Sequence, residues 1–263
     1  MLFRSLGGLA IATVGAPAAW WAFLALESVA VGTMLVLRVP PIESERGAVS
    51  MAAISEGLRF VLGSQVLFGC MLIDLFAVIL GGAESLLPVY AVDILHVGGI
   101  GYGVLAASLN AGALVSAVAL LWLPPVQRPG RALCFAVAGF GVATIAFGLA
   151  RSLLFAVLAY AAVGMADQLS NVMRTTTENL ATPDALRGRM NAVSGLFSGT
   201  SNQLGAVESG FLAAATSPTF SIVAGGLGCL AALGVVALRM PRLRSYRIDE
   251  LSSEPEAFAV SAG

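Results

Sequence analysis

The sequence predicts an all-α integral membrane protein, and its composition and helix-length apolar runs are the main reasons. Of its 263 residues, 58% are hydrophobic and 11% are charged, and the mean hydropathy is +0.89. A typical soluble domain is about 25% charged. A helix needs roughly 20 mostly apolar residues to cross a bilayer, and this chain offers several such runs between short polar segments. A soluble domain would need polar helix faces, which most of these runs lack.

The apolar runs predict seven full membrane spans, preceded by a partial one. We expect the full spans at residues 18–38, 66–92, 100–123, 131–150, 153–176, 189–212 and 218–239. The partial span, residues 2–14, looks like the second half of a longer helix whose beginning is missing. We expect a polar loop at 39–49 and a disordered tail at 240–263. Residues 50–63 carry their apolar side chains on one face, which is typical of a helix lying on the membrane surface.

Arginine placement supports this count and sets the orientation. The chain has 14 basic residues, and all are arginine. If successive spans alternate sides, 13 arginines fall on the side of Arg4, and Arg151 alone falls on the other. Cytoplasmic loops are enriched in basic residues. The sequence therefore predicts a multi-pass protein of the cell membrane with a cytoplasmic C-terminus.

The segment ATPDALRGRM, residues 181–190, is unusually polar for this chain. Its order predicts a helix start, with Thr182 as N-cap, Pro183 in the first turn and Asp184 near the positive helix end. Arg187 and Arg189 would then lie at the level of the lipid headgroups. A capped helix start with snorkelling arginines is enough to explain most of this composition.

Several function classes find no support in the sequence. The net charge of −1 gives no electrostatic case for nucleic-acid binding. The three cysteines lie far apart in apolar runs, and a single histidine, His96, cannot supply a His-based zinc site. Nucleotide-binding, dinucleotide-binding and hydrolase motifs are absent from the sequence. We therefore expect no metal and no cofactor, and an intramembrane enzyme is the weakest reading.

Four sequence segments resemble parts of one known family of membrane proteins. They are PDALRGRM at 183–190, NAVSGLFSGTSNQLGAVESG at 191–210, LIDLFAVILGGAESLLPVYAVDILHVG at 72–98 and RPGR at 128–131. The family is the major facilitator superfamily, and more narrowly its enterobactin-exporter-like branch of bacterial permeases, found in the cell inner membrane. The first two segments resemble a loop and the following helix of that branch. The third resembles its seventh helix and outer loop, and the fourth its short basic loop between helices eight and nine.

The resemblance implies a major-facilitator-type helix bundle, which in the family has twelve helices in two halves. Residues 1–38 would be a remnant of the N-terminal bundle and 39–65 the cytoplasmic central loop. Residues 66–239 would form the C-terminal six-helix bundle, and 240–263 the cytoplasmic tail. Transport in the family runs between the two halves, of which this chain would supply mainly one.

The implied function is secondary active transport: proton-coupled efflux of a small organic molecule, such as a siderophore or drug, by alternating access. The alternative is a truncated or half-size membrane protein without independent transport. Such a protein would act only by pairing with a second half-transporter or with another copy of itself.

Polar side chains inside the predicted spans are the candidate site, because a charge at mid-helix costs about 2.5–3.5 kcal/mol or more. Asp167, Asn171, Arg174 and Glu178 fall on one narrow face of their helix at about 100° per residue. A second stripe in 189–212 comprises Asn191, Ser194, Ser198, Asn202, Gly205 and Ser209. The predicted pathway or coupling residues are Asp74, Glu84, Asn110, Asp167, Asn171, Arg174, Asn202 and Glu208. The predicted cytoplasmic loop residues are Arg128, Arg131, Asp184, Arg187 and Arg189.

Structural explanations compete with these roles. Asp167 and Arg174 could form an internal pair that locks two helices together, and Asp74 is as well explained by packing as by gating. Snorkelling to the interface would account for Arg174 and Glu178. Ser and Gly of the second stripe commonly let helices approach closely. Glu84 and Glu208, nearer the outer side, are candidate proton carriers.

Overall fold

The computed structural model describes residues 16–36, 51–122, 126–183 and 186–240, and within them every regular element is helical. The predicted all-α fold is therefore confirmed. The elements are α2 (Ala16–Val36), α3 (Met51–Gly63), α4 (Gln65–Leu80), α5 (Ala83–Val89), the π-helix η1 (Tyr90–Ile94), α6 (Gly99–Trp122), α7 (Pro129–Gly148), α8 (Leu153–Ala181), α9 (Arg187–Ala215) and α10 (Pro218–Arg239).

A helix occupies each of the seven predicted spans, but five in the described part are both long and apolar enough to cross a membrane. These five are Gln65–Ile94, which joins α4, α5 and η1, together with α6, α7, α8 and α10. Helix α9 has 29 residues but is more polar, and the apolar run described within α2 is the shorter Phe23–Met34. The predicted partial span at 2–14, the loop at 39–49 and the tail beyond Met240 lie outside the described residues.

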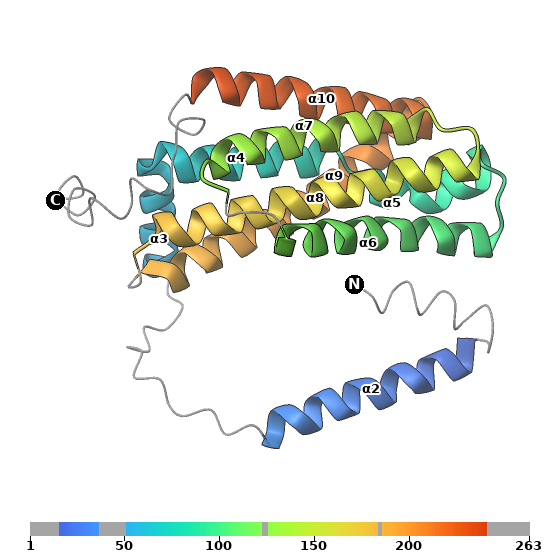
Figure 1. Ribbon diagram of the computed structural model, residues 1–263, viewed down its shortest axis with the longest axis horizontal. Helices are drawn as coiled ribbons and strands as arrows, with labels where there is room; N and C mark the ends of the chain where they lie inside the picture. The colour runs from blue at the N-terminus through green and yellow to red at the C-terminus, as the bar shows by residue number, and fades with distance from the viewer. Residues whose placement is uncertain (1–15, 37–50, 123–125, 184–185, 241–263) are drawn as a thin grey trace.

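Helices α4 to α10 form one bundle, with α3 across one end and α2 drawn apart from it (Figure 1). Helix α8 packs between α6 and α7, α10 packs on α7 and α4, and α9 packs on α4 and α3. We call the two ends of the bundle the α3 end and the η1 end. Helix α4 begins, α8 ends and α9 begins at the α3 end.

An aromatic stack fills the core towards the η1 end. The ring centroids of Tyr90 and Phe147 lie 4.8 Å apart, and those of Phe147 and Tyr160 lie 4.6 Å apart. All three side chains are at most 1% exposed. The Tyr90 hydroxyl lies 2.8–3.0 Å from the carbonyl oxygens of Phe147, Gly148 and Ala150, where α7 ends. The Tyr90 hydroxyl thus offers a hydrogen-bond donor to carbonyl groups at the end of α7, which have no partner within the helix.

Glycines allow backbones of neighbouring helices to touch. A Cβ on Gly112 of α6 would collide with the carbonyl of Ala161 in α8, and one on Gly164 of α8 would collide with the carbonyl of Leu109 in α6. Gly225 of α10 meets the carbonyl of Leu80 in the same way. In lipid, such small residues permit the close packing that holds helices together.

The predicted span 66–92 is interrupted at Gly81 and Gly82, between α4 and α5. A Cβ on Gly82 would lie 2.7 Å from Oγ of Ser209 and 3.0 Å from the carbonyl oxygen of Gly205, so α9 presses on this point. Pro88 inside α5 supplies no N–H, and the chain continues as the π-helix η1. One continuous span was predicted here, although the Gly81–Gly82 pair and Pro88 are residue types that often interrupt a helix.

Thr182 ends α8 and does not start α9, so the predicted N-cap is wrong. Its hydroxyl donates to the carbonyl oxygen of Glu178 at 2.6 Å, within the last turn of α8. Helix α9 begins at Arg187, after Leu186, which makes no side-chain cap. The Thr182 hydroxyl is therefore engaged by the preceding helix before α9 begins.

Helix α3 covers the α3 end through its apolar face, close to the predicted bounds of 50–63. Val61 is 1% exposed and joins a cluster with Leu67, Met71, Met190 and Val193. Its residue Gly57 faces the backbone of α9, where an added Cβ would lie 3.2 Å from the carbonyl oxygen of Arg189. This helix therefore ties the starts of α4 and α9 together.

We predict that Gly112→Ala will destabilise the bundle, because the new methyl group meets the α8 backbone. Overpacking a close-packed contact typically costs about 1–3 kcal/mol. Thermal unfolding of the detergent-purified chain, with Gly103→Ala as control, measures this. Gly103 lies on the same helix with no atom within 4 Å of an added Cβ. Equal melting temperatures for the two variants would contradict the packing described here.

Candidate functional site

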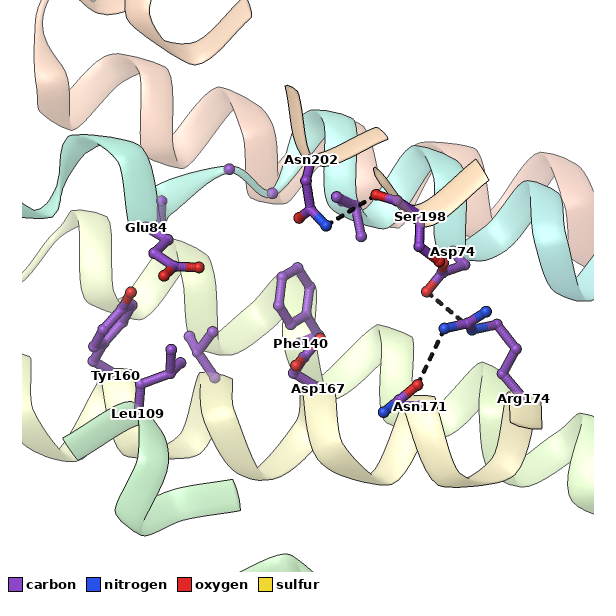
Figure 2. Close-up of a pocket in the computed structure, with 15 residues that line it drawn as sticks. Asp74, Glu84, Leu109, Phe140, Tyr160, Asp167, Asn171, Arg174, Ser198 and Asn202 are labelled. Atoms are coloured by element: carbon purple, nitrogen blue, oxygen red, sulfur yellow. Dashed lines mark hydrogen bonds and ion pairs between the residues drawn. The ribbon is translucent and has the colours of Figure 1, made fainter. Parts of the chain in front are cut away.

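A cavity of about 240 Å³ lies within the bundle, among α4, α5, α8 and α9 (Figure 2). Leu109 of α6 and Phe140 of α7 complete its wall. Several polar side chains that line it are exposed, so the cavity is open on one side of the described bundle. Six of the predicted pathway residues line it: Asp74, Glu84, Asp167, Asn171, Arg174 and Asn202.

Arg174 binds two carboxylates at the α3 end of the cavity. Its Nε lies 3.3 Å from Oδ1 of Asp74, and its Nη1 lies 3.4 Å from Oε1 of Glu178. It also donates to Oγ of Ser194 at 3.1 Å and to Oδ1 of Asn171 at 3.1 Å. The Ser194 hydroxyl in turn donates to Oε2 of Glu178 at 3.1 Å. We call these five side chains the arginine network; it links α4, α8 and α9.

The arginine network is largely shielded from solvent. The side chains of Arg174, Asp74 and Glu178 are 11%, 18% and 6% exposed. A buried charge costs several kcal/mol unless it is paired, and loss of one partner then costs about 3–5 kcal/mol. The interfacial snorkelling considered from the sequence therefore does not describe Arg174 and Glu178. Since one guanidinium faces two carboxylates, the network retains one negative charge when all three are ionised.

Asp167 occupies the middle of α8, as the fifteenth of its 29 residues. It makes no hydrogen bond or ion pair within the described part of the chain, and it is exposed to the cavity. The sequence left open an internal pair between Asp167 and Arg174; the structure pairs Arg174 with Asp74 and Glu178 instead.

Glu84 and Tyr160 line the other end of the cavity, towards η1. Glu84 is exposed, at the start of α5 just after the Gly81–Gly82 break. Tyr160 is 1% exposed, and its hydroxyl has no hydrogen-bond partner among the described residues. Figure 2 shows the hydroxyl end of Tyr160 directed to the side of the cavity where Glu84 lies.

Two predicted pathway residues lie elsewhere. Asn110 donates from Nδ2 to the carbonyl oxygen of Ala106 at 3.1 Å, within its own helix, and Leu109 lines the cavity in its place. Glu208 accepts a bond from Ser209 at 3.4 Å and does not line the cavity. Their polarity marked them from the sequence, but their position around the helix axis turns them from the cavity.

The polar stripe of α9 divides between two roles. Ser198 and Asn202 line the cavity, and Asn202 donates to the carbonyl oxygen of Ser198 at 2.9 Å. Gly205 and Ser209, further along, pack against the end of α4 and the Gly82 turn. The stripe therefore faces the cavity along one part of α9 and packs against α4 along another.

Tyr160 and Phe140 line the cavity but were not among the residues predicted from the sequence, and Ser198 was predicted only as a member of the polar stripe. A signal for Tyr160 existed, because it precedes Asp167 by seven residues and thus lies on the same face of α8. Phe140 carried no comparable signal: aromatic residues in apolar spans are common, and its approach to the cavity depends on how α7 packs.

The predicted loop arginines lie at the ends of helices. Arg128 stands at the N-cap position of α7, and Arg131 is exposed in its first turn. Arg187 donates to the carbonyl oxygen of Asn179 at 3.4 Å, which joins the start of α9 to the end of α8. Arg189 follows in the first turn of α9. Asp184 lies outside the described residues.

A family model described as a transmembrane secretion effector, within the major facilitator superfamily, matches residues 4–260. The chain belongs to this family. Membership confirms the predicted superfamily, and it confirms that the protein is of a transporter family and not an enzyme. No solved structure matches the chain.

Relatives with curated names include the enterobactin exporters of Citrobacter koseri and of Escherichia coli O1:K1 and O45:K1. Each is 27% identical over 244 residues, which is 92% of this chain and 58% of the relative. The chain thus spans little more than half the length of these relatives.

We predict that Arg174→Gln will lower the free energy of unfolding by about 3–5 kcal/mol, because it leaves Asp74 and Glu178 without their cation. Thermal unfolding in detergent measures the change. Arg151→Gln is the matched control, since Arg151 is exposed at the η1 end and forms no ion pair among the described residues; its contacts at 3.3 and 3.5 Å are with neutral oxygens. A loss no larger than that of the control would contradict a stabilising network.

Proposed function

We propose that this chain supplies the cavity-bearing bundle of a secondary active exporter for a small organic molecule. Residues 66–239 would be the C-terminal bundle of the transporter, and 1–38 a remnant of the other. Family membership and the named exporters among the relatives support this proposal. Alternating access would let the cavity face one side of the membrane and then the other.

The observation that carries the proposal is the charged cavity at mid-bundle. Asp167 lies half-way along a helix long and apolar enough to span a membrane. A charge at that depth is costly, so it is kept where it lines a substrate or ion path. A purely structural role would supply Asp167 with a partner, and within the described residues it has neither a hydrogen bond nor an ion pair.

The positions of the carboxylates in the cavity suggest two different roles for them, proton coupling and gating. We assign proton coupling to Asp167 and Glu84, which are exposed to the cavity, and gating to the arginine network. Protonation of Asp74 would weaken its attraction for Arg174 and loosen α4 from α8. Release of that contact would open the cavity at the α3 end.

We propose that the α3 end faces the cytoplasm, together with the C-terminus. Arg187, Arg189 and Arg239 lie at this end of their helices, whereas Arg151 lies at the opposite end of α8. The excess of arginine on one side is what the positive-inside rule requires.

A half-size protein that works only by pairing is the second candidate. The exposed side chains of Asp167, Asn171 and Asn202 form a polar face beside the cavity, and such a face is costly against lipid. A second bundle, from another chain or another copy of this one, would cover it. The exporter and the half-size protein therefore both require a second helix bundle opposite the cavity. They differ in whether that bundle belongs to the same transporter chain or to a separate one.

We predict that Asp167→Asn and Asp74→Asn will each reduce efflux by roughly tenfold or more, while the amount of protein in the membrane stays unchanged. Cells that express the chain are loaded with a panel of small organic molecules, and retention is followed with and without an uncoupler. Asp93→Asn is the control, since Asp93 is exposed in η1 and does not line the cavity.

The outcomes of this assay test the pathway residues, the proton coupling and the half-size candidate in turn. Wild-type efflux by both cavity variants would contradict the pathway assignment. Efflux that survives the uncoupler would contradict proton coupling. Export that appears only when a second bundle is co-expressed, with the two chains migrating together on native gels, would establish the half-size candidate.

A further inference from the structure

The cavity carries more negative than positive charge. Asp74, Glu84 and Asp167 line it, whereas Arg174 is the only cation among the described residues that line it. That guanidinium is already engaged by Asp74 and by Glu178. An anionic ligand would therefore meet carboxylates first, and it could bind Arg174 only if it displaced a paired carboxylate.

The Tyr160 hydroxyl is a separate sign that a polar group is bound here. It is buried at 1% exposure, lines the cavity and lacks a hydrogen-bond partner among the described residues. A buried hydroxyl left unsatisfied costs about 1–3 kcal/mol, so it is usually satisfied by protein, water or ligand. Its oxygen can accept a hydrogen bond from an N–H group that also contacts a carboxylate.

Apolar side chains form a further part of the wall, beside the charged groups and the polar side chains of Asn171, Ser198 and Asn202. Leu109, Phe140 and Val163 contribute it together with the ring of Tyr160. Aromatic faces attract cations as well as apolar groups. The cavity thus combines acceptors for a positive charge with a surface for a hydrophobic body.

We infer that the ligand of this cavity is a small organic amine, bound as its ammonium ion between Asp167, Glu84 and the hydroxyl of Tyr160. The inference rests on the proposed function and names its substrate class. An ammonium group offers N–H donors to the two carboxylates and to the phenol oxygen, while its hydrocarbon part lies against Phe140 and Leu109. A volume of about 240 Å³ suits a body of about one aromatic ring.

The test compares 2-phenylethylamine, which is protonated at pH 7, with phenylacetate, an anion of similar size. Binding of each to the detergent-purified chain is measured by equilibrium dialysis. We expect the amine to bind at least about tenfold more tightly than the anion. Asp167→Asn should weaken amine binding by about tenfold and Tyr160→Phe by several-fold, as expected for hydrogen bonds to a charged group. The matched control Asp93→Asn should leave amine binding unchanged.

Equal binding of the two probes, tighter binding of phenylacetate, or no binding of the amine would overturn the inference. So would amine binding that Asp167→Asn and Tyr160→Phe both leave intact. The proposed function can fail independently of this inference. If the chain binds the amine but cells that express it export none of the molecules tested, the result contradicts transport and leaves the binding site standing. If the chain does not bind the amine and cells that express it export anions, the result contradicts the substrate class and leaves the proposed transport function standing.

Discussion

The attachment of Arg174 to Asp74 and Glu178 is the constraint on which the site depends. It fixes α4, α8 and α9 to one another at the α3 end, through contacts of 3.1–3.4 Å. It also engages Arg174, the one cation that lines the cavity within the described part of the chain, so that this charge is not available to the cavity. Asp167, seven residues earlier on α8, is left without an ion pair in the part of the chain that is described. The same interaction therefore both builds the scaffold and gives the cavity its negative character.

Close backbone contacts complete what the arginine network begins. Gly112 and Gly164 bring α6 and α8 together, and Gly205 lets α9 approach α4 just where the Gly81–Gly82 turn breaks the helix. That turn places Glu84 at the cavity opposite the arginine network. The arginine network and the close glycine contacts thus hold the same helices together. Between these contacts a space lined by polar groups remains in the middle of the bundle.

Much of this arrangement follows from the sequence, and the exceptions have physical causes. Apolar run length located α6 to α10 and the combined stretch of α4, α5 and η1. The seven-residue spacing of Asp167 and Arg174 placed both on one face of α8. The same pattern could not separate Asn110 from its neighbour Leu109, because a rotation of 100° decides which one faces the cavity. It also predicted one span across the break after Leu80, where the Gly81–Gly82 pair stands and Gly205 of α9 packs closely against α4. The choice of Asp74 over Asp167 as partner of Arg174 is likewise a tertiary result.

The central claim is that Arg174 is committed to Asp74, which leaves Asp167 to the cavity. Two double-mutant cycles test it most directly, one combining Arg174→Gln with Asp74→Asn and the other combining Arg174→Gln with Asp167→Asn. Unfolding of each single and double variant in detergent gives the two coupling energies. We expect a coupling of about 1 kcal/mol or more for the Asp74 pair and a clearly smaller one for the Asp167 pair. A coupling to Asp167 equal to or larger than that to Asp74 would contradict the account.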